Sequence, residues 1–202
     1  MAIWCTIRTF DAHARELGND LPQEAIFFTK PTNCIHRENT IPLSSMSNDV
    51  HYETECVLKL NGQGGISHIL VGLDLTDRTQ QDELKSNKLP WARAKCFTAS
   101  AVLGSEQVCT VDVQSLHSKE FNFGIRLRIN GKVVQDEVLY NMSIPPVKQL
   151  ESLHRWAPVQ AGDYLFTGTP QGVGPLQMGD EVEAELFWKN GEVLSSYKAT
   201  CV

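Results

Sequence analysis

Residues 50–60 read VHYETECVLKL, and their many β-branched, aromatic and aliphatic side chains favour a strand. Because side chains alternate across a strand, His51, Glu53 and Glu55 share one face, and that face carries no apolar residue. Carboxylates two positions apart on a strand lie about 7 Å from each other, and they repel unless a positive group lies between them. The stretch therefore predicts a strand that brings two acids to a positively charged partner.

The bulk composition is that of a single folded domain over residues 1–202. With 42% hydrophobic residues, a chain of this length can bury one sizeable core. The formal net charge is −6, and Lys and Arg are not gathered into a stripe. We therefore expect neither nucleic acid nor an anionic membrane surface as a partner.

The cysteines and the amino-terminal residues indicate a compartment. The six cysteines contain no C-x-x-C pair, so we interpret them as reduced thiols. Residues 1–10 lack a cationic segment followed by an apolar run, and no window approaches the roughly 18 apolar residues of a membrane span. A cytoplasmic protein is the expectation.

Periodicity and turn residues predict a mostly β chain with a few short helices. Helical segments are expected at 11–18, where Asp11 is an N-cap candidate, and at 78–88, while the polar residues 32–49 predict a loop. The remainder after residue 90 is expected to be β, with hairpins at Asn130-Gly131 and Asn190-Gly191. Strands are expected at 3–7, 25–31, 50–60, 66–73, 121–138 (as a hairpin), 163–168 and 182–188, followed by a terminal strand.

Acidic residues at strand ends raise the possibility of a metal site. A hard divalent cation such as Mg²⁺ takes oxygen ligands, and Asp74, after the apolar run 66–73, adds a third acid to Glu53 and Glu55. From this pattern alone, three solvated surface acids remain an equal interpretation. Zinc is a further alternative because His51 and Cys56 lie nearby. However, Cys56 faces the other side of the strand, so it is not expected to share one ion with His51.

Several segments spread over most of the chain carry a resemblance to a known family. They are CTIRTFDAHARELG (5–18), FFTKP (27–31), HYETE (51–55), LDLTDRTQQDELKSNKLPWARAKCFTAS (73–100), RINGKVVQ (128–135), AGDYLFTGTPQGVGP (161–175) and MGDEVEAEL (178–186). These segments resemble the fumarylacetoacetate hydrolase family, in particular its small single-domain acylpyruvate hydrolase and oxaloacetate decarboxylase type. The resemblance implies an α+β, mostly β fold, a mixed β-sandwich roll with a few short helices, assembled as a homodimer. It also implies that Glu53, Glu55 and Asp74 bind Mg²⁺ or Mn²⁺.

The resemblance also implies catalytic residues. His13 and Glu16, three apart on a predicted helical turn, match a dyad that activates water, on a segment within residues 1–24 that orders as a lid. From the residues alone, a solvated histidine paired with Glu16 is the simpler interpretation. Lys95 matches a lysine beside the metal, where an ammonium helps to neutralise an enolate oxygen. An exposed loop lysine is the alternative.

Further positions match ligand contacts. Arg78 and Gln81, on the predicted helix after Asp74, and Thr169, in the TGTP turn, are implied to bind the substrate. Arg78 and Gln81 are equally compatible with a helix surface, and TGTP with an ordinary turn. His51 and Lys30 are expected to lie behind the metal ligands as hydrogen-bonding groups. Their partner is expected to be a small keto-acid substrate.

Three departures from the family pattern affect the expected lid and substrate more than the metal ligands. Relatives carry G-x-N-Y where this chain has Ile7-Arg8-Thr9-Phe10, an acid where it has Thr79, and a longer segment between Glu55 and Asp74.

The resemblance leads to a primary hypothesis and two alternatives. The primary hypothesis is a metal-dependent hydrolase that cleaves a carbon–carbon bond in acylpyruvate-like β-dicarbonyl acids and also decarboxylates oxaloacetate. The first alternative is an isomerase or tautomerase on the same scaffold, which needs the metal and the enolate-stabilising groups but not the dyad. The second is a catalytically weakened keto-acid or metal-binding protein.

Overall fold

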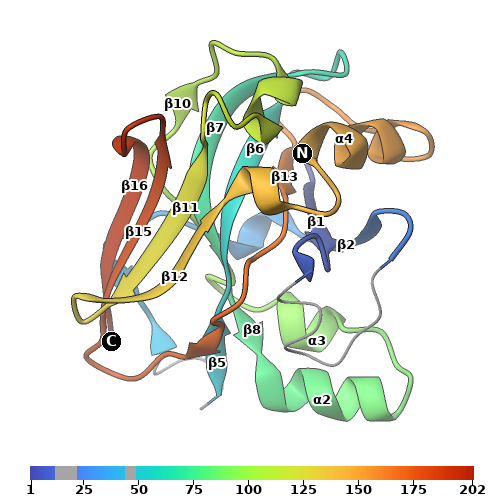
Figure 1. The fold of residues 1–202 in the computed structure, drawn as a ribbon. Coiled ribbons are helices and arrows are strands. Elements are labelled where there is room, and N and C mark those ends of the chain that lie inside the picture. The colour runs from blue at the N-terminus through green and yellow to red at the C-terminus, as the bar shows by residue number, and fades with distance from the viewer. Residues whose placement is uncertain (12–21, 44–48) are drawn as a thin grey trace.

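The computed structural model describes residues 1–11, 22–43 and 49–202, and this part of the chain is mostly β with three α-helices (Figure 1). This agrees with the predicted fold class. None of the described helices is long and apolar enough to cross a membrane. The predicted helix at 11–18 lies outside the described residues except for its first position. The described helices are α2 (Arg78–Ser86), α3 (Ala92–Lys95) and α4 (Pro146–His154).

The largest described sheet has the strand order β2-β1-β13-β6-β7-β9-β3, with β10 paired to β7. It mixes parallel pairs, β1 with β13 and β3 with β9, with antiparallel ones. Its strands are β1 (Ile3–Ile7), β2 (Ile26–Lys30), β3 (Ile35–His36), β6 (Thr54–Leu60), β7 (Ile66–Asp74), β9 (Ala101–Leu103), β10 (Gln107–Val108) and β13 (Tyr164–Phe166).

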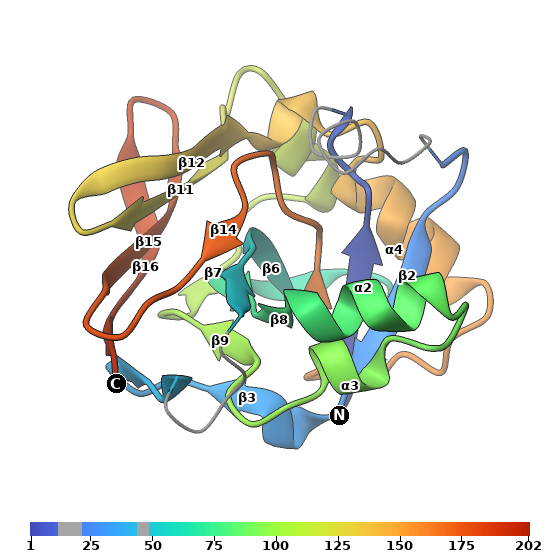
Figure 2. The same cartoon turned by 90° about the horizontal axis from the view of Figure 1, so that it is seen from below.

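Two smaller sheets complete the fold. One has the order β12-β11-β15-β16-β4 and packs across β6 and β7, so that the main core lies between the two layers (Figure 1). The other has the order β14-β5-β8 and lies near α2 and α3 (Figure 2). Their strands are β4 (Thr40–Ile41), β5 (Val50–Tyr52), β8 (Thr76–Asp77), β11 (Gly124–Ile129), β12 (Lys132–Val138), β14 (Gly174–Pro175), β15 (Glu181–Trp188) and β16 (Glu192–Cys201).

The sequence predicted one strand over residues 50–60. The structure has two strands there, and they belong to different sheets. β5 pairs with β14 and β8, whereas β6 lies between β13 and β7. The chain changes sheets at Glu53, whose carbonyl accepts a hydrogen bond from the Asp74 amide at 2.9 Å. Residues 54–58 are all buried, because β6 is covered on both faces. The expected single face shared by His51, Glu53 and Glu55 therefore does not describe this stretch.

Local turn chemistry predicted the hairpins correctly but missed the helix α4. Asn130 and Gly131 have φ values of 52° and 76° and join β11 to β12, as expected for an Asn-Gly turn. Helix α4 begins with Pro146 in its first turn, where proline fits because no hydrogen bond from its nitrogen is needed. It buries Leu150 and Leu153 at helical spacing. The expected loop at 32–49 also contains the short strands β3 and β4.

Candidate active site

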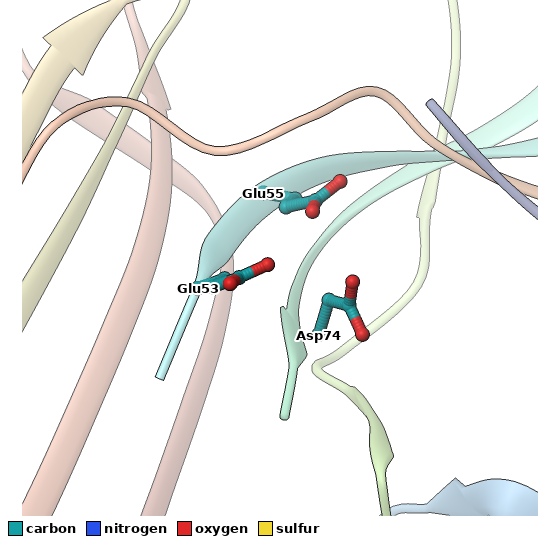
Figure 3. Close-up of side chains that lie close together, drawn as sticks. All are labelled: Glu53, Glu55 and Asp74. Atoms are coloured by element: carbon teal, nitrogen blue, oxygen red, sulfur yellow. The ribbon is translucent and has the colours of Figure 1, made fainter. Parts of the chain in front are cut away.

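Three buried carboxylates meet where the two longest neighbouring strands of the large sheet begin and end (Figure 3). Glu53 lies at the break before β6, Glu55 lies on β6, and Asp74 ends the antiparallel strand β7. Their exposed fractions are 7%, 2% and 1%, and one oxygen from each lies within 4.8 Å of the others. Three converging carboxylate oxygens form a donor set that fits a hard divalent cation such as Mg²⁺ or Mn²⁺.

Three cationic side chains compensate these carboxylates. Lys95 Nζ lies 2.9 Å from Glu53 and 2.7 Å from Asp74, and Lys30 Nζ lies 2.5 Å from the other oxygen of Asp74. The Arg78 guanidinium bonds to Glu53 at 2.7 Å. The positive partner expected for the acids of 50–60 is therefore present at Glu53, where Arg78 comes from α2 and Lys95 from α3. This compensation is required because unpaired buried charges are strongly destabilising.

Lys95 is fixed by all three of its N–H donors. Besides the two carboxylates, it donates to the Thr76 hydroxyl at 2.6 Å, and its side chain is 3% exposed. Burial by itself would lower the pKa of Lys95, but the adjacent Asp74 and Glu53 carboxylates outweigh it and hold the pKa well above its usual value. The group is therefore a permanent positive charge at the site.

Glu55 has a different environment from the other two acids. Burial, together with the neighbouring Asp74 charge, raises the pKa of Glu55 well above its ordinary value, although a hydrogen bond from the Gly168 amide opposes the shift. That bond, 2.6 Å long, ties the TGTP turn directly to the acid. Gly168 has a φ of 97°, and a β-carbon there would collide with the Thr9 hydroxyl. The Thr9 hydroxyl donates to the Thr167 carbonyl at 2.8 Å, so the segment that follows β1 is bonded to the turn.

Gln135 is an important residue of the site that sequence reasoning missed. Its Nε2 donates to the Thr169 hydroxyl and the Pro170 carbonyl, both at 2.9 Å, while its Oε1 accepts from the Thr54 amide at 3.0 Å. It therefore joins the TGTP turn to the start of β6. Only its place in the matched RINGKVVQ segment could have indicated it.

The carboxylates open into a pocket whose lining includes all three predicted substrate contacts. Arg78, Gln81 and Thr169 all line it, and Arg78 donates to Gln81 Oε1 at 2.7 Å. Residues not predicted to belong to the site also contribute. The complete lining is Thr6, Ile7, Arg8, Glu53, Glu55, Asp74, Arg78, Gln81, Lys85, Trp91, Lys95 and Thr169.

The remaining predicted residues have different outcomes. Lys30 contacts Asp74, with its side chain fully buried and further bonds to the carbonyls of Leu75 and Ser100. His51 does not lie behind the ligands: its Nε2 is 3.0 Å from Asp49, and it makes no hydrogen bond to the three acids in the described structure. The sheet change at Glu53 separates it from them. His13 and Glu16 are outside the described residues.

The mostly β fold and the buried acidic centre define a metal-dependent enzyme of a known class. The chain belongs to the fumarylacetoacetate hydrolase family, because the family model described as "Fumarylacetoacetate (FAA) hydrolase C-terminal" matches residues 2–200. A mitochondrial oxaloacetate tautomerase of Schizosaccharomyces pombe is 32% identical, with 91% of this chain and 87% of that protein covered.

Two solved structures share the fold over the whole chain. One, from Oleispira antarctica, is described as a fumarylacetoacetate isomerase/hydrolase; its TM-score is 0.92 at 29% identity, with 100% of this chain and 93% of that chain covered. The other is a fumarylpyruvate hydrolase from Pseudomonas aeruginosa in complex with Mn²⁺ and pyruvate. Its TM-score is 0.84 at 26% identity, with 100% and 89% covered.

Proposed function

We propose that the protein is a divalent-metal-dependent enzyme that stabilises the enolate of a 2-keto acid, and that its reaction is the keto–enol tautomerisation of oxaloacetate. The observation that carries this proposal is the buried group of Glu53, Glu55 and Asp74 with the Lys95 ammonium on two of its members. The names of the matched tautomerase and of the pyruvate complex support the substrate class.

Glu53, Glu55 and Asp74 would hold the metal, because they supply three hard oxygen donors in a buried position. When bound, Mg²⁺ or Mn²⁺ would polarise the keto group and stabilise the negative charge that develops on it. Neighbouring groups hold these donors in place: the Gly168 amide donates to Glu55, and the Arg78 guanidinium binds Glu53.

The chain's own cations favour the enolate. Tautomerisation breaks a C3–H bond and forms an O–H bond, so negative charge collects on the keto oxygen between the two steps. Lys95, protonated and nearly excluded from water, places a fixed positive charge beside that developing charge. Arg78 and Gln81, bonded to each other, give preoriented polar groups on one wall of the pocket. They would position the 2-keto acid.

Hydrolysis of acylpyruvates is the second candidate, supported by the match to the fumarylpyruvate hydrolase. It additionally needs an activated water, the role predicted for His13 with Glu16. The two activities are therefore expected to differ in their need for His13 and Glu16. A catalytically weakened keto-acid-binding protein would retain the metal and show neither activity.

The test is a Mg²⁺- and Mn²⁺-dependent assay with oxaloacetate, acetylpyruvate and fumarylpyruvate, in which loss of the enol absorbance or cleavage is followed. We expect Glu53→Gln to lower kcat/KM by at least about 100-fold, because several kcal/mol of charge stabilisation would be lost. Glu83→Gln, on the exposed face of α2, is the matched control and should leave activity unchanged.

The His13→Ala variant separates the candidates. Retained oxaloacetate tautomerisation together with loss of acylpyruvate cleavage assigns the dyad to hydrolysis. If the parent protein turns over none of the three compounds with either metal, the proposal of an enzyme for these substrates is wrong.

A further inference from the structure

The charges of the active-site pocket are not fully paired within the described structure. Lys30, Lys95 and Arg78 form ion pairs with two of the three acids, Asp74 and Glu53. Two further cations, Arg8 and Lys85, line the same pocket. The pocket lining therefore contains four cationic side chains, Arg8, Arg78, Lys85 and Lys95, against three acids, so the cations outnumber the acids by one.

Lys85 has neighbours but no anionic partner at ion-pair distance among the described residues. Its ammonium donates to the neutral Gln81 Oε1 at 3.1 Å and lies 5.2 Å from the centre of the Trp91 ring. Burial and the nearby Arg78 charge lower the pKa of Lys85, although Asp82 opposes them. Burial is the larger cause of the lowered pKa, and the positive charge of Arg78 adds to it.

Arg8 has fewer polar contacts than Lys85 among the described residues. Its guanidinium makes no hydrogen bond or ion pair with residues 1–11, 22–43 or 49–202, although many other arginines of the chain make one. Its φ of 58° is in the left-handed region, which is unfavourable for a residue with a β-carbon. The neighbours on both sides are fixed, Ile7 by its pairing in β1 and Thr9 by its bond to the Thr167 carbonyl. Such strain is retained where the surrounding structure requires that conformation, and it is concentrated at functional sites.

The position of Arg8 indicates what it would contact. It lines the acidic pocket and also an adjoining groove whose other residues are largely apolar, and Trp91 and Ile7 line both as well. Arg8 is thus at the junction of the two. If the far end of a ligand were apolar and entered the groove, it would cover the Arg8 guanidinium without supplying an anion. This is unfavourable because the buried charge would lose its hydration. A carboxylate at the same point would form charge-assisted hydrogen bonds.

We propose that Arg8, assisted by Lys85, binds the second carboxylate of a dicarboxylic 2-keto acid and thereby selects such acids over 2-keto acids with an apolar end. The first carboxylate and the keto group would face the three acids and their metal. This inference rests on the proposed function for the identity of the reacting end, but it concerns a different part of the pocket.

The test measures binding of two non-reacting acids, malate and lactate, by calorimetry with Mg²⁺ present. The two share the 2-hydroxy acid end and differ in the second carboxylate. We expect the parent protein to bind malate at least about tenfold more tightly than lactate, from the range for hydrogen bonds between charged groups. Arg8→Met should weaken malate binding by about 10- to 100-fold and lactate binding by less than about twofold.

Three further variants control the result. Arg8→Lys should retain most of the preference for malate, Lys85→Met should lose a smaller part of it, and Arg93→Met, on the exposed side of α3, should lose none. Arg8→Gly removes the charge and the backbone strain together, so it should behave like Arg8→Met if charge is the cause. Thermal unfolding of each variant verifies that it is folded.

The inference is overturned if the parent protein shows no preference for malate, or if Arg8→Met weakens both ligands equally or neither. Its failure can be distinguished from that of the proposed function. An Arg8-dependent preference for malate in a protein that turns over no keto acid supports the binding site and refutes the proposed reaction. Turnover of oxaloacetate without that preference does the opposite.

Discussion

Replacement of Lys30 by methionine tests whether the acidic centre depends on a cation that a ligand cannot reach. Lys30 enters from β2, its side chain is fully buried, and its ammonium lies 2.5 Å from Asp74. It also donates to the carbonyls of Ser100 at 2.6 Å and Leu75 at 3.1 Å. Methionine keeps most of the buried stem, so the change removes the charge and its three contacts and leaves packing largely intact.

The expected cost follows from what remains. Removal of one partner from a buried ion pair costs about 3–5 kcal/mol, because the other charge is left uncompensated. Asp74 retains Lys95 at 2.7 Å, and the Ser100 carbonyl still accepts from the Leu75 amide. The lower end of the range, about 3 kcal/mol, is therefore expected. For a chain of 202 residues this corresponds to a fall in Tm of about 6–12 °C.

The assay is urea unfolding followed by the fluorescence of the four tryptophans, with EDTA present so that metal binding does not contribute. Lys148→Met is the matched control, since Lys148 forms an exposed ion pair with Glu151 at 2.8 Å and should cost less than about 1 kcal/mol. A loss below about 1 kcal/mol for Lys30→Met, or an equal loss in the control, would refute the reasoning.

Three other changes have defined outcomes. Gly168→Ala should lower the free energy of unfolding by at least about 1 kcal/mol more than Gly191→Ala in urea, because both have positive φ but only Gly168 adds a collision with Thr9. Partial burial would raise the pKa of Glu106, but hydrogen bonds to a lysine, a tyrosine and an arginine outweigh it and lower the pKa from 4.5 to about 2. The stabilisation that Glu106 gives over Glu106→Gln should therefore be complete above about pH 4.5 and disappear as the pH falls towards about 2, measured by urea midpoints. Addition of Mg²⁺ at about 100 times its Kd should raise the stability of the EDTA-treated protein by about 2.7 kcal/mol, and Glu55→Gln should abolish the gain.

The acids of the site could be predicted from the sequence, but the geometry that joins them could not. Glu53, Glu55 and Asp74 lie near strand ends, and the HYETE and LDLT segments that resemble the family identified them. The alternation rule that placed His51 with them was wrong, because it assumes that one strand continues in one sheet. The chain changes sheets at Glu53 because β5 pairs with β14 and β8, whereas β6 pairs with β13 and β7. All four partner strands come later in the sequence, so the local pattern does not reveal the change.

Local sequence patterns also could not identify site residues whose role depends on long-range contacts. Gln135 lies on a hairpin strand that was predicted correctly, yet its bonds to Thr169 and Thr54 connect positions 34 and 81 residues away. Arg8 lies in the segment Ile7-Arg8-Thr9-Phe10, which departs from the G-x-N-Y pattern of the family. The resemblance therefore drew attention to the absent glycine, asparagine and tyrosine and not to the arginine. Its importance comes from a φ value and from the lack of a partner in the described structure, and neither can be derived from residue type.

The two buried lysines show why the number of charges alone does not describe the site. Lys30 approaches Asp74 from the core, where two backbone carbonyls hold it, whereas Lys95 approaches from the pocket and binds only side-chain oxygens. The Leu75 and Ser100 carbonyls lie directly beside β7, β8 and β9, so Lys30 is held by backbone next to the strands. Lys95 is held through side chains alone, and two of them belong to the acids Glu53 and Asp74. We therefore expect a bound metal or substrate to change the contacts of Lys95 and to leave those of Lys30 with the two carbonyls in place.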